Sequence, residues 1–578
     1  MKEKVLELVS QALASLQQQG RFLNADPQSI IIERPRSGPH GDFTTNLAMQ
    51  LASKQKVSPR ECAQSIVDSM PSCEILERCE IAGPGFINFY VHSEAYLDLI
   101  DEIREAGPDY GRSRIENSPK VLIEFVSSNP TGPLHVGHGR GAAYGDALAR
   151  TMSYAGYDVE REYYVNDAGR QMDTLTVSIW IRYLEELGLV SEFPARGYQG
   201  DYIRNIGKRL LEEHQKRFAV HAETLFQDLP EDDEENIDEL INRAKSSLDD
   251  DYQILFDMAS QSMVQDIKQD LAEFGVVFDQ WFHESQLVHN GDIEAALERL
   301  EKNGYLYVKD GATWFRSTDF EDDKDRVVVR ANGSKTYFAS DIAYHYNKAE
   351  RNYDQVINVF GADHHGYTKR IEASFQALGN PADRLEFLMV QFAVLYRGSA
   401  KVSMSTRGGE FVSLRELREE VGNDAARFFY VLRRSDQHMD FDLDLAKSES
   451  AENPVFYIQY AHARISSVFQ QVKGRGMETP DNRQPAYRLL IEKQETELLK
   501  TLSQFPDTVV NAAQTRTPHQ VAYYLRNLAQ LFHAYYNEHP FLSSEDELRL
   551  ARLGLIDAVR VVIANGLGIL GVSAPTSM

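Results

Sequence analysis

The sequence predicts a multidomain protein, in which an α/β core with a parallel sheet lies between an N-terminal α+β domain and an all-α C-terminal helical bundle. Its 578 residues exceed what one hydrophobic core holds. An apolar, β-rich run at 120–128 is broken at 129–133, and a helical pattern at 138–155 ends before a second strand-like run at 159–165. Strand, turn, helix and strand in this order open a doubly wound, Rossmann-like sheet.

The N-terminal 115 residues are predicted to form the α+β domain. Apolar residues recur at helical spacing from Val5 to Leu16, and Gly20 ends the pattern. Residues 30–32 and 81–91 have strand-like composition, and 43–54 has a helical pattern. The turn-forming residues at 107–119 predict a linker.

The core is predicted to span 116–413 and to carry a helical insertion at about 195–325. The α/β pattern returns at 327–330, 337–341 and 356–362. From 414 the pattern is helical to the end, which predicts a connecting helical segment at 414–452 and a helical domain at 453–578.

Composition excludes several classes of protein. With 42% apolar and 26% charged residues, the chain is neither disordered nor collagen-like, and no apolar run approaches the ~18 residues of a membrane helix. Glu3 and Glu7 argue against a signal peptide. Three cysteines without metal-type spacing fit a reducing, cytoplasmic setting and predict no structural zinc.

The net charge of −26 is unevenly distributed along the chain. Residues 228–251 hold 11 acidic side chains, whereas the last 128 residues hold 12 basic and 12 acidic ones. The negative net charge of the chain therefore does not exclude a nucleic-acid partner, but any such contact is expected to use local basic faces.

The first candidate site is the segment 133–141, PLHVGHGRG, which follows a predicted buried strand and opens a helix. A helix N-terminus offers unpaired N–H groups that suit phosphate, and glycines allow close approach of a ligand. His135 and His138 are placed to donate hydrogen bonds to phosphate oxygens. A metal pair and two structural histidines remain the alternative interpretations.

Two further segments support a nucleotide site. GADHHG at 361–366 follows the apolar strand 356–360, at the sheet edge where ligands bind, and suits either a metal or the ribose and adenine of a nucleotide. KVSMSTRGG at 401–409 is a small basic loop that suits a cation acting on a pyrophosphate.

The order and spacing of these three segments resemble the class I aminoacyl-tRNA synthetases, with HVGH and KVSMSTR in place of the HIGH and KMSKS signatures of that class. The chain further resembles the bacterial arginyl-tRNA synthetase family over its whole length. The stretches that carry this resemblance include SSNPTGPLHVGHGRGA at 127–142, YYVNDAGRQ at 163–171, GADHHGY at 361–367 and NPVFYIQYAHARI at 453–465.

The resemblance implies that ATP activates L-arginine to an adenylate and that the arginyl group passes to the terminal ribose of tRNA(Arg). It assigns catalytic roles to His135, His138, Lys401 and Arg407. It assigns the ATP site to Pro133, His135, Gly137, His138, Gly361, Asp363, His364, Met404 and Ser405. It assigns the arginine site to Glu124, Ser127, Asn129, Tyr337, Asp341 and His365. Independently, a guanidinium favours carboxylates and an aromatic face, and Tyr337 and Asp341 share a face if their segment is helical.

One segment departs from the class pattern. Aligned on Met404 and Ser405, the two lysine positions of KMSKS are occupied by Ser403 and Thr406. Lys401 is therefore the first candidate for the phosphate cation, and Arg407 is the second.

The resemblance also implies Mg²⁺ bound with ATP, a monomer in the cytoplasm, a C-terminal anticodon-binding domain and an N-terminal domain at the tRNA elbow. Candidate tRNA contacts are Arg34, Arg36, Tyr457, Tyr460 and Arg464. Three alternatives stay open: a nucleotidyltransferase that adenylates a small acid without tRNA, a tRNA-binding paralogue without catalysis, and a metal hydrolase.

Overall fold

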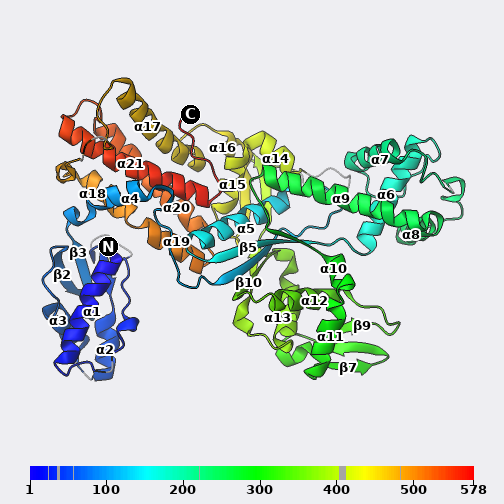
Figure 1. Cartoon of the computed structure of the whole chain (residues 1–578), viewed down its shortest axis with the longest axis horizontal. Coiled ribbons are helices and arrows are strands. Elements are labelled where there is room, and N and C mark those ends of the chain that lie inside the picture. Colours follow the sequence, from blue (N-terminus) through cyan, green and yellow to red (C-terminus); the bar gives the residue numbers. More distant parts are fainter. Residues whose placement is uncertain are drawn as a thin grey trace.

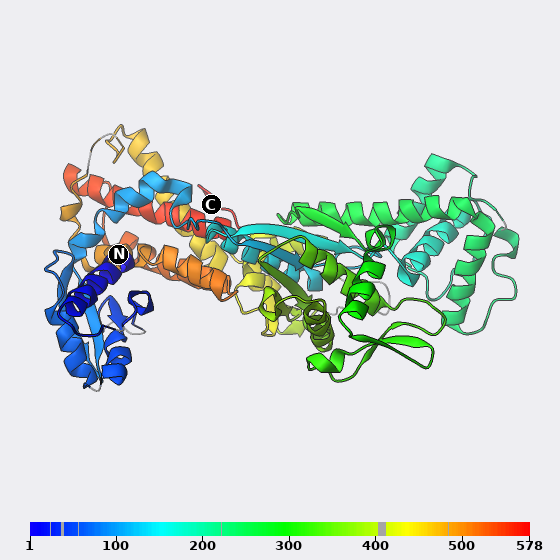
Figure 2. The same ribbon diagram turned by 60° about the horizontal axis from the view of Figure 1, so that its bottom comes forward.

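The computed structural model describes residues 1–23, 25–35, 40–55, 57–220, 222–402, 412–481, 483 and 485–578. The molecule is elongated, with the N-terminal domain and the C-terminal helices at one end, a parallel sheet in the middle and inserted helices at the other end (Figure 1). A second view shows the same order (Figure 2).

The N-terminal domain packs three helices, α1 (Lys2–Gln18), α2 (Leu47–Gln55) and α3 (Pro59–Asp68), with a three-stranded sheet. The strands β1 (Phe43–Thr45), β2 (Leu76–Ala82) and β3 (Phe86–Val91) pair antiparallel in the order β1-β3-β2. The strand predicted at 30–32 does not form, because pairing starts at Glu33 and the side chains of Ile30 and Ile32 fill the core. The helix predicted from Phe43 starts at Leu47, because 43–45 pairs with β3.

The central sheet confirms the predicted parallel core. Five strands lie in the order β11-β10-β4-β5-β6, and every neighbouring pair is parallel. Their bounds are β4 (Lys120–Phe125), β5 (Asp158–Val165), β6 (Gln280–His283), β10 (Gln355–Gly361) and β11 (Leu385–Val390). Because parallel strands end at one edge, the residues that follow β4 and β10 lie side by side.

Helices cover both faces of this sheet. Val121, Ile123 and Phe125 of β4 belong to the same core as α5 (Val136–Tyr154), which packs so closely that a Cβ on Gly145 would lie 2.3 Å from Phe125 Cγ. The opposite face, which carries Leu122 and Glu124, is covered by α12 (Tyr337–Glu350) and α13 (Thr368–Ala377).

The segment between β5 and β10 holds two insertions rather than the single helical one predicted at 195–325. Four helices form an inserted helical domain: α6 (Arg170–Glu186), α7 (Asp201–His214), α8 (Asp233–Leu248) and α9 (Asp250–Glu273). The chain then rejoins the central sheet as β6. A second insertion follows with α10 (Glu284–His289), α11 (Asp292–Lys302), β7 (Leu306–Lys309), β8 (Ala312–Phe315) and β9 (Arg326–Val329).

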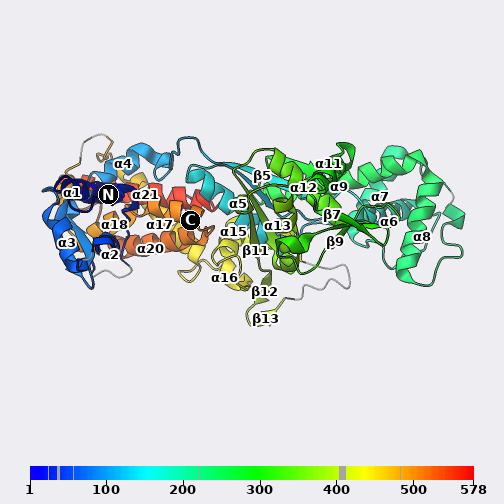
Figure 3. The same ribbon diagram turned by 90° about the horizontal axis from the view of Figure 1, so that it is seen from below.

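Two groups of elements follow the central sheet. The first comprises β12 (Ala393–Arg397), β13 (Ala400–Lys401), α14 (Leu414–Val421), α15 (Asn423–Val431), β14 (Met439–Asp442) and α16 (Leu443–Lys447). β12 and β13 project from the body of the molecule (Figure 3). The second is the predicted helical bundle, with α17 (Pro454–Gly474), α18 (Lys493–Leu502), α19 (Phe505–Gln514), α20 (His519–Glu538) and α21 (Asp546–Ile569).

Helix α4 (Leu99–Ala106) lies inside the predicted N-terminal domain but packs on α21 of the bundle. Arg104 Nε donates to Asp557 Oδ2 at 3.0 Å, and buried Tyr110 stacks on Phe505. The three-stranded domain therefore ends near Val91, and the segment after it is part of the helical end of the molecule.

Candidate active site

A cavity of about 630 Å³ opens where β4 and β10 end, and we call it the motif cavity. Its lining includes Pro133, His135, Gly137 and His138 of the first predicted segment, and Gly361, Asp363 and His364 of the second. The sheet topology thus brings together two segments that are more than 200 residues apart in the sequence, as their shared position at strand ends predicts.

The two histidines of HVGH are held in one tautomer by the start of α5. His135 is the N-cap residue, and its Nδ1 accepts from the Gly137 N–H at 3.0 Å. His138 Nδ1 accepts from the His135 N–H at 3.3 Å. Since each Nδ1 accepts, the proton of each neutral ring resides on Nε2, which makes Nε2–H the donor.

Burial keeps both imidazoles neutral. It lowers the pKa of His135, and burial together with neighbouring His135 lowers the pKa of His138 to about 3. The rings stack with centroids 3.7 Å apart. A Cβ on Gly137 would lie 2.7 Å from His135 Cε1, so the glycine is required for this stacked arrangement.

The chain leaves β4 through two residues with unusual backbone angles. Val126 and Ser127 have φ of 68° and 41°, a region that costs about 1–3 kcal/mol for residues other than glycine. Ser127 Oγ accepts from the Tyr164 N–H at 3.1 Å, which holds the turn in place. Both residues line the motif cavity and also a second cavity that adjoins it, so the strained backbone lies at the boundary between the two cavities.

A second cavity of about 420 Å³, which we call the acidic cavity, adjoins the first. Three carboxyl groups line it: Glu124 of β4, Glu284 of α10 and Asp341 of α12. Tyr337 lies one turn before Asp341 on α12, and both line the cavity, as their four-residue spacing predicts. The two cavities share several residues, namely Val126, Ser127, Asn129, Val359, Phe360, Gly361 and His364.

The pKa of Asp341 lies well above the usual value for an aspartate. Burial, aided by nearby Glu284 and Glu124, raises its pKa to about 7, against the lowering effect of the hydrogen bond from Tyr367 OH. Burial also raises the pKa of Glu284. The cavity therefore concentrates acidic groups that a bound cation would stabilise in their charged form.

Glu124 is held by a buried polar network. Lys348 Nζ donates to Glu124 Oε2 at 2.5 Å and to Asn358 Oδ1 at 2.7 Å. The Asn358 amide contacts His345 Nε2 at 2.9 Å, and His345 Nδ1 lies 2.9 Å from the backbone oxygen of Asp341. Burial lowers the pKa of His345 to about 3, so Lys348 supplies the network's positive charge.

Other predicted site residues lie away from these cavities or outside the described residues. His365 is exposed and lines neither cavity, and Lys401 is exposed on β13. Arg36, Met404, Ser405 and Arg407 fall outside the residues that the structure describes.

Of the candidate tRNA contacts, Arg34 stacks on Phe43 at 4.5 Å and donates to Ser503 Oγ at 3.2 Å, so it joins the N-terminal domain to the bundle. On α17, Arg464 packs between the rings of Tyr460 and Tyr536 at 4.6 and 4.7 Å. Tyr457 packs on His533, with ring centroids 4.5 Å apart.

Sequence reasoning missed Glu284, Tyr164, Tyr367 and Lys348, which complete the acidic cavity and its support. The signal available was QWFHE at 280–284, a short aromatic strand that ends in polar residues. The helical insertion predicted at about 195–325 covers this run, whereas in the structure β6 pairs parallel with β5 and ends at the same sheet edge.

Comparison with known proteins divides the chain into three matched parts. Residues 3–91 match the family model of the arginyl tRNA synthetase N terminal domain, 103–449 that of the class I (R) tRNA synthetase catalytic domain, and 458–578 that of the DALR anticodon binding domain. The fold and the match over 103–449 therefore define a class I tRNA synthetase.

Full-length relatives narrow the class. The arginine–tRNA ligase of Thioalkalivibrio sulfidiphilus is 53% identical, and that of Legionella pneumophila (strain Corby) is 50% identical, each over 100% of both chains. A structure described as a putative arginyl-tRNA synthetase from Campylobacter jejuni matches with 31% identity and a TM-score of 0.74, covering 84% of this chain and 100% of that one. The Thermus thermophilus arginyl-tRNA synthetase, 24% identical, shares the fold with a TM-score of 0.75 over 100% of both chains.

The chain belongs to the arginine–tRNA ligase family. It uses ATP to activate L-arginine and transfers the arginyl group to tRNA(Arg), releasing AMP and pyrophosphate. Within the described residues, no helix is long and apolar enough to cross a membrane, and no group of three or more His, Cys, Asp or Glu side chains is arranged to hold a metal ion.

Proposed function

We propose that the acidic cavity binds arginine and that the motif cavity binds ATP, with the reacting atoms meeting at the residues the two cavities share. The single observation that carries this assignment is the common wall at Ser127, Asn129 and His364. A substrate with a cationic end and a carboxylate end fits a site that is acidic at one end and opens onto a phosphate-binding helix N-terminus at the other.

In this arrangement the guanidinium of arginine lies beside Asp341 and Glu284, with the ring of Tyr337 against its face. Two buried carboxyl groups with raised pKa values support this placement, since a fork of N–H donors supplies the charge and the hydrogen bonds they lack. Glu124, held by Lys348, is assigned to the α-amino group, because it lies at the end of β4 just before Ser127.

The arginine carboxylate then attacks the α-phosphorus of ATP, and pyrophosphate leaves. The Nε2–H groups of His135 and His138 donate to the phosphate oxygens as charge builds on them. Being neutral and fixed before the substrates bind, they need no reorganisation, which is the property that makes such donors effective. In the second step, the terminal ribose hydroxyl of tRNA attacks the arginyl carbonyl and AMP leaves.

Mg²⁺ is assigned to the ATP phosphates, with which it enters as part of the substrate. Lys401, followed by Arg407, stays the candidate cation for the pyrophosphate.

Tyr457, Tyr460 and Arg464 stay candidates for the anticodon loop, because partly exposed aromatic rings around an arginine suit base stacking. A monomer in the cytoplasm completes the proposal and rests on the family resemblance.

The experiment that tests the assignment is arginine-dependent ATP–pyrophosphate exchange by Asp341→Asn and by His138→Ala, each measured over both substrate concentrations. The assignment requires the first variant to change the arginine dependence and the second to lower kcat. If Asp341→Asn changed only the ATP dependence and His138→Ala only the arginine dependence, the two cavities would be assigned the wrong way round.

A further inference from the structure

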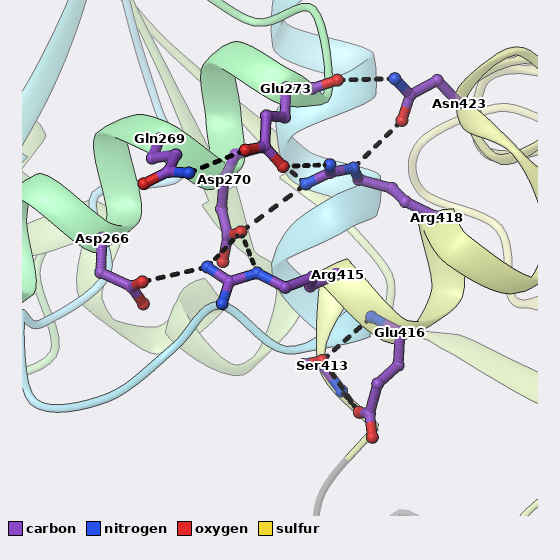
Figure 4. Close-up of polar contacts among 9 residues, drawn as sticks. All are labelled: Asp266, Gln269, Asp270, Glu273, Ser413, Arg415, Glu416, Arg418 and Asn423. Carbon is purple, nitrogen blue, oxygen red and sulfur yellow. Dashed lines mark hydrogen bonds and ion pairs between the residues drawn. The ribbon is translucent and has the colours of Figure 1, made fainter. Parts of the chain in front are cut away.

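Helices α9 and α14 are joined by a group of ion pairs outside both cavities, which we call the α9–α14 cluster (Figure 4). Its members are Asp266, Asp270 and Glu273 of α9 and Arg415 and Arg418 of α14. The three acids recur at spacings of four and three residues, and the two arginines are three apart, so each set occupies one face of its helix.

The contacts in the cluster are specific. Arg415 Nε donates to Asp270 Oδ1 at 2.9 Å and its Nη2 to Asp266 Oδ1 at 3.0 Å. Arg418 Nη2 donates to Glu273 Oε2 at 2.6 Å, and its Nη1 donates to the Asp270 backbone oxygen at 3.3 Å. The Asp270 side chain is fully buried, and burial raises its pKa although two guanidinium groups face it.

Helix α9 extends between two different hydrophobic cores, and the acidic residues of the cluster lie on its last part. The first part of α9, including Tyr252, Leu255 and Met263, belongs to the core of the inserted helical domain. Its last part, including Ile267 and Leu271, belongs to the core of the catalytic domain. With 24 residues, α9 is about 36 Å long and reaches from one core to the other (Figure 1).

On its other side, α14 is attached to the HVGH motif. Leu414 N donates to the Leu134 backbone oxygen at 2.8 Å, and the Val136 N–H donates to the Val412 backbone oxygen at 3.1 Å. Ser413 forms a bridge with His135 and caps α14 in a reciprocal pair with Glu416. The buried side chain of Leu414 also sits against Gly139, where a Cβ would lie 2.8 Å from Leu414 Cδ1.

We propose that Arg415 and Arg418 are positioning residues for arginine activation, which fix α14, and with it the backbone of HVGH, relative to the inserted helical domain. Neither arginine lines the motif cavity or the acidic cavity, so each acts through the backbone pairing of 412–414 with 134–136. Small displacements of reacting groups are costly, since about 1 Å can lower a rate by roughly 100-fold.

The test is a double-mutant cycle on the Arg418–Glu273 pair, using Arg418→Gln, Glu273→Gln and the combination. The measured quantity is kcat of ATP–pyrophosphate exchange per active site, with the active sites titrated so that unfolded enzyme does not count. We expect each single variant to lower kcat about tenfold with the KM for ATP and arginine within twofold of wild type, and the double variant to be no slower than the slower single one.

Arg415→Gln is the stronger variant, because Arg415 makes the shorter ion pair with buried Asp270 and also pairs with Asp266, so its loss challenges folding as well as position. Arg415→Lys, which keeps the charge and loses the two-carboxylate contact, should recover part of kcat. The matched control is Arg217→Gln, which breaks the exposed pair with Asp251 at the far end of α9 and should leave kcat unchanged. Wild-type kcat per active site in Arg418→Gln, or multiplicative effects in the double variant, would overturn the proposal.

Discussion

The motif cavity is centred on the HVGH turn with its two uncharged imidazoles, whereas the acidic cavity is lined by three carboxyl groups, one of which, Glu124, pairs with buried Lys348. The HVGH geometry is local, because Gly137, His135 and His138 contact one another within one helical turn. The acidic cavity is assembled from β4, α10 and α12, which are far apart in the chain. The local motif is held by its own hydrogen bonds with both rings neutral, while a cluster of carboxyl groups is stabilised in its charged form by a bound cation.

The largest effect is expected at the acidic cavity, from Asp341→Asn. Losing one buried carboxylate that pairs with a guanidinium costs about 2–4 kcal/mol, so kcat/KM for arginine should fall roughly 30- to 1000-fold. The amide keeps the size of the side chain and relieves repulsion from Glu284 and Glu124, so the Tm should not fall. Steady-state exchange kinetics measure kcat/KM for arginine, and thermal unfolding measures the Tm. A kcat/KM for arginine within threefold of wild type would show that Asp341 does not bind the guanidinium.

At the motif cavity, His138→Ala should lower kcat about 100-fold, the usual cost of removing one fixed donor to a developing charge. Arginine binding should be unchanged, because His138 lines the other cavity. His92→Ala is the matched control, since this exposed histidine of the N-terminal domain lines neither cavity and its removal should change kcat by less than twofold. Equal losses in the two variants would contradict the distinction between them.

The two cavities should also differ in pH dependence. Asp341 must be ionised to pair with arginine, and its pKa of about 7 in the empty cavity means that it is protonated below that pH. We therefore expect kcat/KM for arginine to rise about tenfold per pH unit below 7 and to level off above it. His138, neutral at every pH above its pKa of about 3, adds no slope in this range. A kcat/KM for arginine that stays constant from pH 6 to 8 would contradict a requirement for ionised Asp341.

The smallest effect is expected from Lys401→Ala. The side chain is exposed on β13 and lies outside both cavities, so a loss of about 1 kcal/mol, roughly fivefold in kcat, is the expected scale. The KM for ATP should change less than kcat, because a cation that acts on the departing pyrophosphate acts mainly in the transition state. Pre-steady-state measurement of adenylate formation separates the effect on ATP binding from the effect on the chemical step. An unchanged rate of adenylate formation would leave Arg407 as the candidate cation for the pyrophosphate.

The same contrast explains what the sequence alone reveals. The parallel core, HVGH and its place at a strand end are predictable, because hydrophobic periodicity and glycine spacing are local signals. Lys348 is not, because nothing near it in the sequence shows that α12 faces β4. Glu284 is signalled only by the short aromatic run at 280–284, which does not by itself show that β6 returns to the central sheet. The boundary near residue 115 fails for a similar reason, since α4 is an ordinary amphipathic helix until its partner α21 is known.

Below pH 7, arginine binding is expected to convert Asp341 from a largely protonated group into a carboxylate. Isothermal titration calorimetry of arginine binding at pH 6.5, in buffers that differ in ionisation enthalpy, measures the protons exchanged. Wild-type enzyme should release a fraction of a proton, more at pH 6 than at pH 8, and Asp341→Asn should release none from this group. Binding without proton release at pH 6.5, or equal release by the variant, would contradict this expectation.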